Sequence, residues 1–310
     1  MARLEVKIGN MTLKNPVMTA SGTAGYGEEL SGFFDISALG ALVVKGISLK
    51  PMGGNPPPRI CETSCGMINS IGLQNVGLKV FLKEKLPPLR DINTNIIVNI
   101  LGNTVAEYVR LASELDNSGG VDGIELNVSC PNVKKGGLLF GTDKKAMTNL
   151  IKKVRETVKN SALIVKLSPG APSIKDFASA AEDSGADAVS LINTIPAMSI
   201  DINTRRPRIK NIIGGLSGPA IKPIALRMVW EASNAVKIPV IGIGGIINSD
   251  DAIEFILAGA MAVAVGTGIF LNPLAPVDII KGIEDYLGKN NMEDINELIG
   301  GMIACNNPDH

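Results

Sequence analysis

Residues 239–267 read PVIGIGGIINSDDAIEFILAGAMAVAVGT, and this stretch contains the pattern that decides the fold. A short apolar run, Pro239–Ile243, ends in two glycines and is followed by a helical pattern over Ser249–Ala258. A second apolar run, Ala260–Val265, then leads into Gly266-Thr267-Gly268. Apolar runs of this length are typical of parallel strands that are buried on both faces. The stretch therefore predicts a strand–helix–strand unit.

The same unit recurs along the chain. Six further strands are predicted, at Val17–Ala20, Leu39–Val44, Asn95–Ile100, Gly123–Val128, Ala162–Leu167 and Ala186–Ile192. Helices are predicted over residues 28–36, 105–115, 144–158, 173–183, 219–235, 249–258 and 275–286. Eight such repeats favour a closed (β/α)8 TIM barrel. A doubly wound sheet is the alternative, but no G-x-G-x-x-G opens a helix after the first strand.

Three segments fall outside this alternation. Leu4–Leu13 predicts an N-terminal β-hairpin around a Gly9-Asn10 turn. Residues 49–75 are rich in Gly, Pro, Asn and Ser, and we interpret them as an ordered binding loop, because long connections in compact domains are usually functional. Pro196–Gly218 is predicted as an irregular insert. No segment resembles a linker, so residues 1–310 are predicted to form a single domain, with the long loops over the C-terminal face of the barrel.

Composition excludes several classes of function. The formal net charge is zero and the pI is about 6.6, which does not favour nucleic acid or an anionic membrane as partner. No apolar run approaches the ~18 residues of a spanning helix, and the first residues lack a signal-peptide core, so we predict a cytoplasmic protein. The four cysteines form no C-x-x-C pair and the only histidine is His310, so no metal site is predicted.

Polar residues gather where the predicted strands end. In barrels of this type, chemistry is carried by the C-terminal ends of the strands. Those ends carry Ala20-Ser21, Lys45-Gly46, Asn99, Asn127, Lys166, Asn193-Thr194, Gly244-Gly245 and Gly266-Thr267. Asparagine supplies both a donor and an acceptor, which suits a planar heterocycle, and lysine suits an electron-rich or anionic ring. The glycine pairs, with Gly215–Gly218, precede predicted helices, where bare N–H groups bind phosphate.

The stretch Glu125–Asn132 places Cys130 where a strand becomes a loop, followed by a glycine-rich segment over residues 133–143. This arrangement favours a catalytic thiol on a gating loop, although a lone cysteine is also a common buried apolar residue. Lys45 and Lys166 also have an interpretation without function, as side chains that bury their apolar stems while their ammonium groups reach solvent. A rival enzyme class is a Schiff-base aldolase with Lys166 as nucleophile. A non-catalytic assembly subunit is a further alternative.

The chain resembles the dihydroorotate dehydrogenase family, and within it the catalytic subunits of the class 1B, NAD-linked branch. The motifs that carry the resemblance occur in order: TASG at 19–22, GNP at 54–56, NSIGLQN at 69–75, ELNVSCPNVK at 125–134, VKLSP at 165–169, INT at 192–194, GGLSGPAIKP at 214–223 and VGT at 265–267. The resemblance implies an FMN-containing barrel that oxidises (S)-dihydroorotate to orotate in de novo pyrimidine synthesis, transferring hydride to FMN.

The resemblance also assigns residues, with Cys130 as the catalytic base. For the substrate it implies Lys45, Asn69, Ile71, Gly72, Leu73, Asn127, Asn132, Asn193 and Thr194. For FMN it implies Ala20, Ser21, Lys45, Gly46, Asn99, Asn127, Lys166, Ile192, Gly218, Gly244, Gly245, Gly266 and Thr267.

The same resemblance implies a partner. Class 1B catalytic subunits pair with an iron–sulfur flavoprotein that carries FAD and a [2Fe–2S] cluster and passes electrons to NAD, as a homodimer within a heterotetramer. A fumarate-linked class 1A enzyme and a related pyrimidine-reducing flavoenzyme are the alternatives. The membrane-bound class has a helical extension before the barrel, whereas the first strand is expected here from about Arg3.

Overall fold

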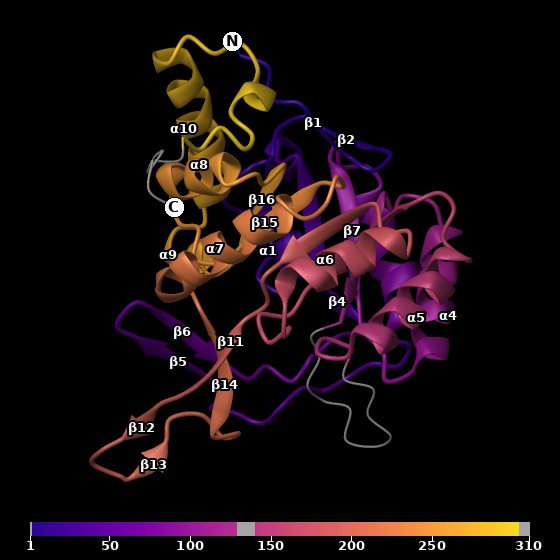
Figure 1. The fold of residues 1–310 in the computed structure, drawn as a ribbon. Coiled ribbons are helices and arrows are strands. Elements are labelled where there is room, and N and C mark those ends of the chain that lie inside the picture. Colours follow the sequence, from indigo (N-terminus) through magenta and orange to yellow (C-terminus); the bar gives the residue numbers. More distant parts are fainter. Residues whose placement is uncertain (1, 129–139, 304–310) are drawn as a thin grey trace.

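The computed structural model describes residues 2–128 and 140–303. At its centre, eight parallel strands close into a barrel (Figure 1). These strands are β3 (Val17–Thr19), β4 (Ala41–Ile47), β7 (Asn95–Ile100), β8 (Gly123–Asn127), β9 (Ala162–Lys166), β10 (Ala188–Leu191), β15 (Val240–Ile243) and β16 (Ala262–Val265). Their order around the barrel follows the chain, and β16 pairs with β3 to complete the ring. The predicted (β/α)8 barrel is confirmed.

Helices connect the strands and cover the outside of the barrel (Figure 1). The longer ones are α4 (Val105–Asp116), α5 (Lys144–Arg155), α6 (Ile174–Asp183), α7 (Lys222–Ser233), α8 (Ser249–Leu257) and α10 (Ala275–Lys289). Short helices are α1 (Glu28–Ser31) and α9 (Gly268–Leu271), with 3-10 turns at Ile36–Ala38, Pro219–Ile221 and Ile295–Glu297. Thr104, Ser173 and Asn248 each accept a hydrogen bond from the backbone N–H three residues later. Such caps contribute about 1 kcal/mol each, and they fix where a helix begins relative to the strand before it.

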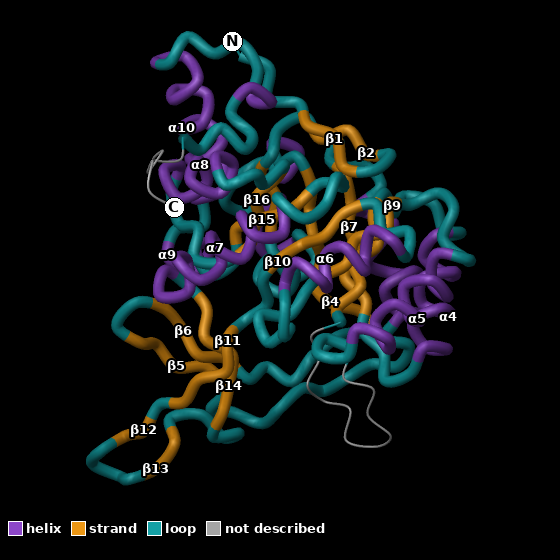
Figure 2. The backbone as a smooth tube through the Cα atoms, in the orientation of Figure 1, coloured by secondary structure: helices purple, strands orange, loops and turns teal. Residues whose placement is uncertain are grey.

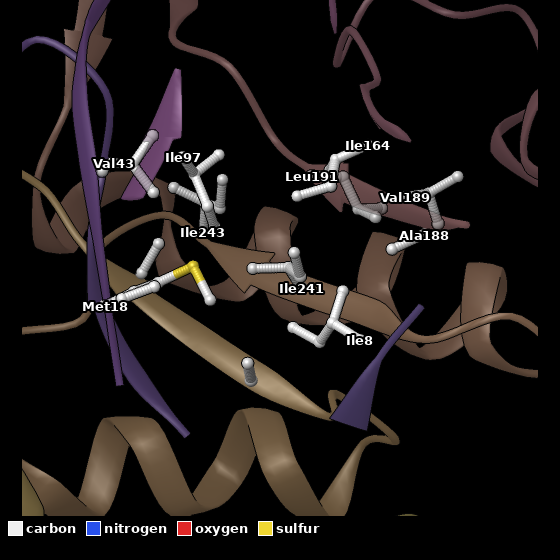
Figure 3. Close-up of a cluster of buried hydrophobic side chains, with 14 of the residues drawn as sticks. Ile8, Met18, Val43, Ile97, Ile164, Ala188, Val189, Leu191, Ile241 and Ile243 are labelled. Carbon is white, nitrogen blue, oxygen red and sulfur yellow. The ribbon is translucent and has the colours of Figure 1, made fainter. Parts of the chain in front are cut away.

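The strands bury both faces, which explains their apolar sequences. All five residues of β9 are buried, and so are all four of β10. Figure 3 shows part of this core, in which Met18, Ile164 and Ile241 are each at most 2% exposed. Burying such side chains removes apolar surface from water, the dominant favourable term in folding.

The predicted N-terminal hairpin is present. β1 (Val6–Ile8) pairs antiparallel with β2 (Met11–Leu13), and its burial alternates so that Ile8 faces inward and Lys7 faces solvent. Gly9, in the turn, lies against Asp187 and Ala162, which stand where β10 and β9 begin. Figure 3 draws Ile8 in the same buried cluster as Ile241. The hairpin therefore seals the barrel at the end where the strands start.

A second sheet projects from the other end (Figure 2). It is antiparallel, in the order β11 (Ile195–Met198), β14 (Ile213–Ser217), β6 (Gly66–Asn69) and β5 (Ile60–Thr63). β12 (Ile200–Asp201) and β13 (Arg206–Pro207) pair as a separate two-stranded arm. The prediction of an irregular insert at 196–218 was wrong, and the ordered binding loop predicted at 49–75 contains two strands that were not predicted. Each segment forms an antiparallel hairpin, β5–β6 and β11–β14, and the two hairpins join through β6 and β14. Their Gly and Pro content conceals the alternation that β5 shows only in its burial.

One helical region was not predicted. α2 (Leu78–Val80), a π-helical turn (Phe81–Lys85) and α3 (Leu86–Leu89) follow one another between β6 and β7. The buried residues are Leu78, Phe81, Leu86 and Leu89. Their 3-5-3 spacing departs from a regular helical repeat, and the π turn, which takes up an extra residue, brings all four to one side. The prolines of α3 lie in its first turn, where a missing N–H costs nothing.

Shortening a buried side chain of the N-terminal hairpin tests how much the hairpin contributes to stability. Ile8 is fully buried, so Ile8→Ala is expected to lower the free energy of unfolding by about 2–5 kcal/mol, through lost burial and the cavity left behind. Lys7→Ala, on the exposed face of the same strand, is the control and should change it by less than about 0.5 kcal/mol. Urea titrations of both variants measure the difference, and equal stabilities would show that the hairpin does not close the core.

Candidate active site

The predicted site residues follow the strands at one end of the barrel, where the backbone ties neighbouring loops together. Ala20 follows β3, and its N–H donates to the carbonyl of Val265, the last residue of β16, at 2.8 Å. Next to it, Ser21 Oγ accepts a hydrogen bond from Lys166 Nζ at 3.1 Å. Because β3 and β9 stand on opposite sides of the ring, this bond spans the top of the barrel.

Two more pairs complete this rim. Asn193 Nδ2 lies 3.5 Å from Asn127 Oδ1, so the carboxamides after β10 and β8 face one another. A Cβ placed on Gly46 would stand 2.7 Å from Asn99 Oδ1, which shows how closely β4 and β7 approach here. The structure therefore brings the predicted asparagines and lysines of separate strands to one place.

Lys45 is a cation at this rim whose pKa is lowered. Burial lowers the pKa of its ammonium, the Arg59 guanidinium lowers it further, and the Glu29 carboxylate partly opposes both. Within the described residues, its Nζ has no hydrogen-bond or ion-pair partner. A half-buried cation beside a second cation is the arrangement that an anionic ligand stabilises, because the ligand supplies the missing charge.

Three glycine turns converge at the same end of the barrel. Gly218 precedes the turn into α7, Gly244-Gly245 precedes α8, and Gly266-Thr267 precedes α9. A Cβ on Gly245 would stand 2.9 Å from the carbonyl oxygen of Gly218, and one on Gly218 would stand 3.5 Å from Thr267 Cγ2. On the other side, a Cβ on Gly244 would stand 3.6 Å from Ile192. These three turns pack closely together and leave little room for side chains. We call this group of turns, at Gly218, Gly244-Gly245 and Gly266-Thr267, the glycine cup.

A partly exposed ion cluster lies beside these turns. Lys222 Nζ, at the start of α7, donates to Asp251 Oδ1 at 2.6 Å and to Glu254 Oε1 at 2.9 Å, both on α8. Asp251 Oδ2 also accepts from the backbone N–H of Ile247. The Asp251 hydrogen bond raises the pKa of Lys222. The cluster fixes two helix starts beside the cup, and helix starts concentrate N–H groups that bind anions.

The loop that carries Asn69, Ile71, Gly72 and Leu73 approaches from the second sheet. Asn69 Nδ2 donates to the carbonyl of Gly215 at 3.4 Å. A Cβ on Gly215 would collide with the Thr194 side chain, so Asn69 and Thr194 lie on either side of one backbone segment. Leu73 has a φ of 58°, a conformation that non-glycine residues rarely adopt.

Asn55 and Arg59 hold that loop. Asn55 donates from its backbone N–H to the carbonyl of Ile71 at 2.9 Å and from Nδ2 to that of Ser70 at 2.9 Å. Arg59 Nη2 donates to Gln74 Oε1 at 2.7 Å. A Cβ on Gly72 would stand 2.5 Å from the Asn55 backbone nitrogen, which explains why only glycine fits there.

Two residues that the sequence analysis did not select, Glu125 and Ser190, lie among the predicted ones. Glu125 is 3% exposed, and its carboxylate accepts from Asn99 Nδ2 at 2.6 Å and from Ser190 Oγ at 2.7 Å. Its Oε2 lies 3.7 Å from Lys166 Nζ. The sequence feature that could have identified Glu125 is a charged residue in the middle of an apolar strand.

Cys130 and Asn132 lie outside the described residues, so their positions stay predictions. Tyr108 contacts described residues on both sides of that segment. Its OH donates to the carbonyl of Asn127 at 2.6 Å, and its ring packs edge-on against Phe140 at 5.8 Å between centroids. Tyr108 is fully buried, so its contacts fix Asn127 and Phe140, on either side of that segment, to the barrel.

Two searches of the described residues were negative. Across residues 2–128 and 140–303, no group of three or more His, Cys, Asp or Glu side chains is placed to hold a metal ion. Within the same ranges, no helix combines the length and apolar character needed to cross a membrane.

Comparisons with known proteins give one consistent result. The family model described as Dihydroorotate dehydrogenase matches residues 3–287. A protein of Thermoanaerobacter sp. (strain X514), named Dihydroorotate dehydrogenase B (NAD(+)), catalytic subunit, is 57% identical over 299 residues, which cover 96% of this chain and 98% of that protein. Proteins with the same name from Thermodesulfovibrio yellowstonii and Geobacter sulfurreducens are 58% and 56% identical, each over 96% of this chain and 98% of the relative.

The matched residues span the whole barrel and its rim, so the chain is an oxidoreductase of the (β/α)8-barrel class. It belongs to the dihydroorotate dehydrogenase family, which is a family of flavoproteins. The Schiff-base aldolase alternative finds no support in this assignment.

Adding a methyl group at Gly245 tests how tightly the glycine turns pack. Gly245 has a φ of 76°, and a Cβ there would stand 2.8 Å from Lys222 Cβ, so Gly245→Ala is expected to cost about 1–3 kcal/mol of stability and to displace the turn. Gly288→Ala in α10 is the control, because its Cβ would meet no atom within 4 Å; it should be neutral or stabilising by up to about 1 kcal/mol. Urea unfolding compares them, and a stable Gly245→Ala variant would contradict the tight cup.

Proposed function

We propose that this protein is the catalytic subunit of an NAD-linked dihydroorotate dehydrogenase, which oxidises (S)-dihydroorotate to orotate in pyrimidine synthesis. The observation that carries the proposal is the identity of 55–58% over nearly the full length to relatives with that name. The geometry supports it independently, because carboxamides, lysines and a glycine cup meet at one end of the barrel.

An FMN in each chain is the proposed cofactor, and the residues present fit it. Gly218, Gly244, Gly245 and Gly266 carry no side chain where helices start, so their backbone N–H groups can be approached closely, which suits the phosphate. Asn99 and Lys166, on β7 and β9 of the same barrel, suit the polar edge of a flavin. Ala20, Ser21, Lys45, Gly46, Asn127, Ile192 and Thr267 complete the proposed flavin-binding set. When bound, FMN accepts the hydride that leaves C6 of the substrate.

The chain's own groups bind the substrate and move a proton. Dihydroorotate is an anionic ring edged with carbonyl and N–H groups, and opposed carboxamides such as Asn127 and Asn193 offer both donors and acceptors to it. Asn69, Ile71, Gly72, Leu73, Asn132 and Thr194 are the other proposed substrate ligands, with Lys45 supplying positive charge. Lys45 carries the half-buried charge that a carboxylate would offset.

Cys130 is the proposed base. Its thiolate takes the proton from C5 as hydride leaves C6, so a C5=C6 double bond forms and the substrate loses two electrons. An ordinary thiol has a pKa of about 8.5, so its ionised fraction at neutral pH grows when cations are near. A positioned base typically accelerates such a step by 10²–10⁴-fold.

Removing the thiol tests this role. Cys130→Ala is expected to slow reduction of the bound flavin by dihydroorotate by about 10²-fold or more, measured in single turnover by stopped flow. Cys61→Ala is the matched control, since Cys61 lies on β5 of the second sheet and outside the proposed site. Undiminished flavin reduction in Cys130→Ala, with orotate formed at the normal rate, would rule out the thiol as base.

The route of the electrons forms a separate proposal. The relatives' name includes "catalytic subunit", and on that basis we propose an iron–sulfur flavoprotein partner with FAD and a [2Fe–2S] cluster, a homodimer within a heterotetramer, and a cytoplasmic location. FAD and the cluster belong to the partner in this proposal.

Reoxidation of the reduced chain identifies the acceptor. The purified chain is expected to pass electrons from dihydroorotate to an artificial dye, and to NAD only when the co-purified partner is present. Absorbance at the flavin bands and NADH formation are the two readouts. Rapid reoxidation by fumarate without a partner would instead favour the fumarate-linked class, and NAD reduction by the chain alone would contradict the division of labour.

A further inference from the structure

A carboxylate is buried inside the barrel, beside two of the residues proposed to hold the flavin. Glu125 lies in the middle of β8 and is 3% exposed, and the other four residues of that strand are buried as well. Burying an ionised carboxylate is costly unless charges and hydrogen bonds compensate it. The residue therefore requires partners, and its partners show what it does.

The barrel register supplies those partners from three neighbouring strands. Asn99 on β7 stands directly opposite Glu125, so their side chains point the same way, and Asn99 Nδ2 donates to Oε2 at 2.6 Å. Ser190 on β10 donates to Oε1 at 2.7 Å, although β9 lies between β8 and β10. The carboxylate therefore reaches across the barrel interior, and both its oxygens are held.

The third contact is to Lys166, which is 5% exposed. Its Nζ lies 3.7 Å from Glu125 Oε2 and donates to Ser21 Oγ at 3.1 Å. Glu125 and Ser21 together hold the ammonium at the top of the barrel. The lysine charge is thus placed below the rim and partly offset by a negative charge on its inner side.

The carboxylate also determines how the Asn99 carboxamide is oriented. A carboxylate only accepts hydrogen bonds, so the amide nitrogen of Asn99 must face it. Its Oδ1 then faces Gly46, where a Cβ would stand 2.7 Å away. The orientation of one proposed flavin ligand, and the charge balance of another, therefore depend on Glu125.

We propose that Glu125 is a positioning residue for the flavin: it fixes the Asn99 carboxamide and the Lys166 ammonium and sets how strongly the site favours the reduced cofactor. This inference rests on the proposed function, in which FMN lies at this rim. A reduced flavin gains negative charge, and a nearby cation stabilises it. A carboxylate behind that cation weakens the stabilisation, so Glu125 keeps the bound flavin easier to reoxidise.

Neutralising the carboxylate is the direct test. Glu125→Gln keeps the size of the side chain and a carbonyl acceptor, but removes the charge. It is expected to strengthen binding of reduced over oxidised FMN by about tenfold, a rise of about 30 mV in the two-electron potential. Ser190→Ala is the matched control, since it removes one hydrogen bond to the same carboxylate and leaves the charge; it should shift the potential by less.

Potential and affinity are measured separately, on flavin-loaded protein. The midpoint potential comes from equilibration with a reference dye, and the dissociation constant of oxidised FMN from recovery of flavin fluorescence. A purely structural role would weaken both redox forms equally and leave the potential unchanged. An unchanged potential in folded, flavin-loaded Glu125→Gln therefore overturns the proposal.

A second variant keeps the test decisive if Glu125→Gln does not fold. Glu125→Asp keeps the negative charge inside the barrel but shortens the side chain, which weakens the hydrogen bonds from Ser190 and Asn99. It should weaken oxidised FMN severalfold and leave the potential near that of the unmodified protein, and unchanged affinity in this variant would overturn the proposal. An unmodified chain that retains no FMN would contradict the proposed function itself, whereas normal loading with an unresponsive potential contradicts only the role of Glu125.

Discussion

Closure of the ring by β16 and β3 is the constraint on which the site depends. Val263 pairs with Val17 and Val265 with Thr19, and the ladder continues through the N–H of Ala20. A closed parallel barrel has no free edge, and all its strands point the same way. All the strands therefore end at the same rim of the barrel. The strand register determines how far along the barrel axis each residue lies. Asn127 and Ser190 both stand opposite Lys166 for this reason.

The sequence predicts the barrel well because the information there is local. Most strand residues are apolar, and four of the six longer helices begin after a polar cap residue, such as Thr104 or Asn248. The second sheet was not predictable in the same way. Asn69 and Gly215 are paired although 146 residues separate them, so neither segment shows its partner. The π turn at Phe81–Lys85 also breaks the helical period on which sequence reading relies.

The site was predictable in part, and for a simple reason. One rule, that chemistry lies where barrel strands end, selects Lys45, Asn99 and Lys166, and the structure brings these strand ends together. Glu125 was not selected because it precedes the strand end, and only the register shows that its side chain joins Asn99 to Lys166. The substrate and the roles of Cys130 and Asn132 came from resemblance, since bare residue types do not specify a substrate.

The shared sheet links two insertions that leave the barrel after different strands. β6 belongs to the connection after β4, and β11 and β14 belong to the connection after β10. β14 pairs with both β6 and β11, so a change in the length of either insertion would break hydrogen bonds that the other one needs. During evolution these two loops are therefore expected to lengthen, shorten or be exchanged together, as a single inherited unit.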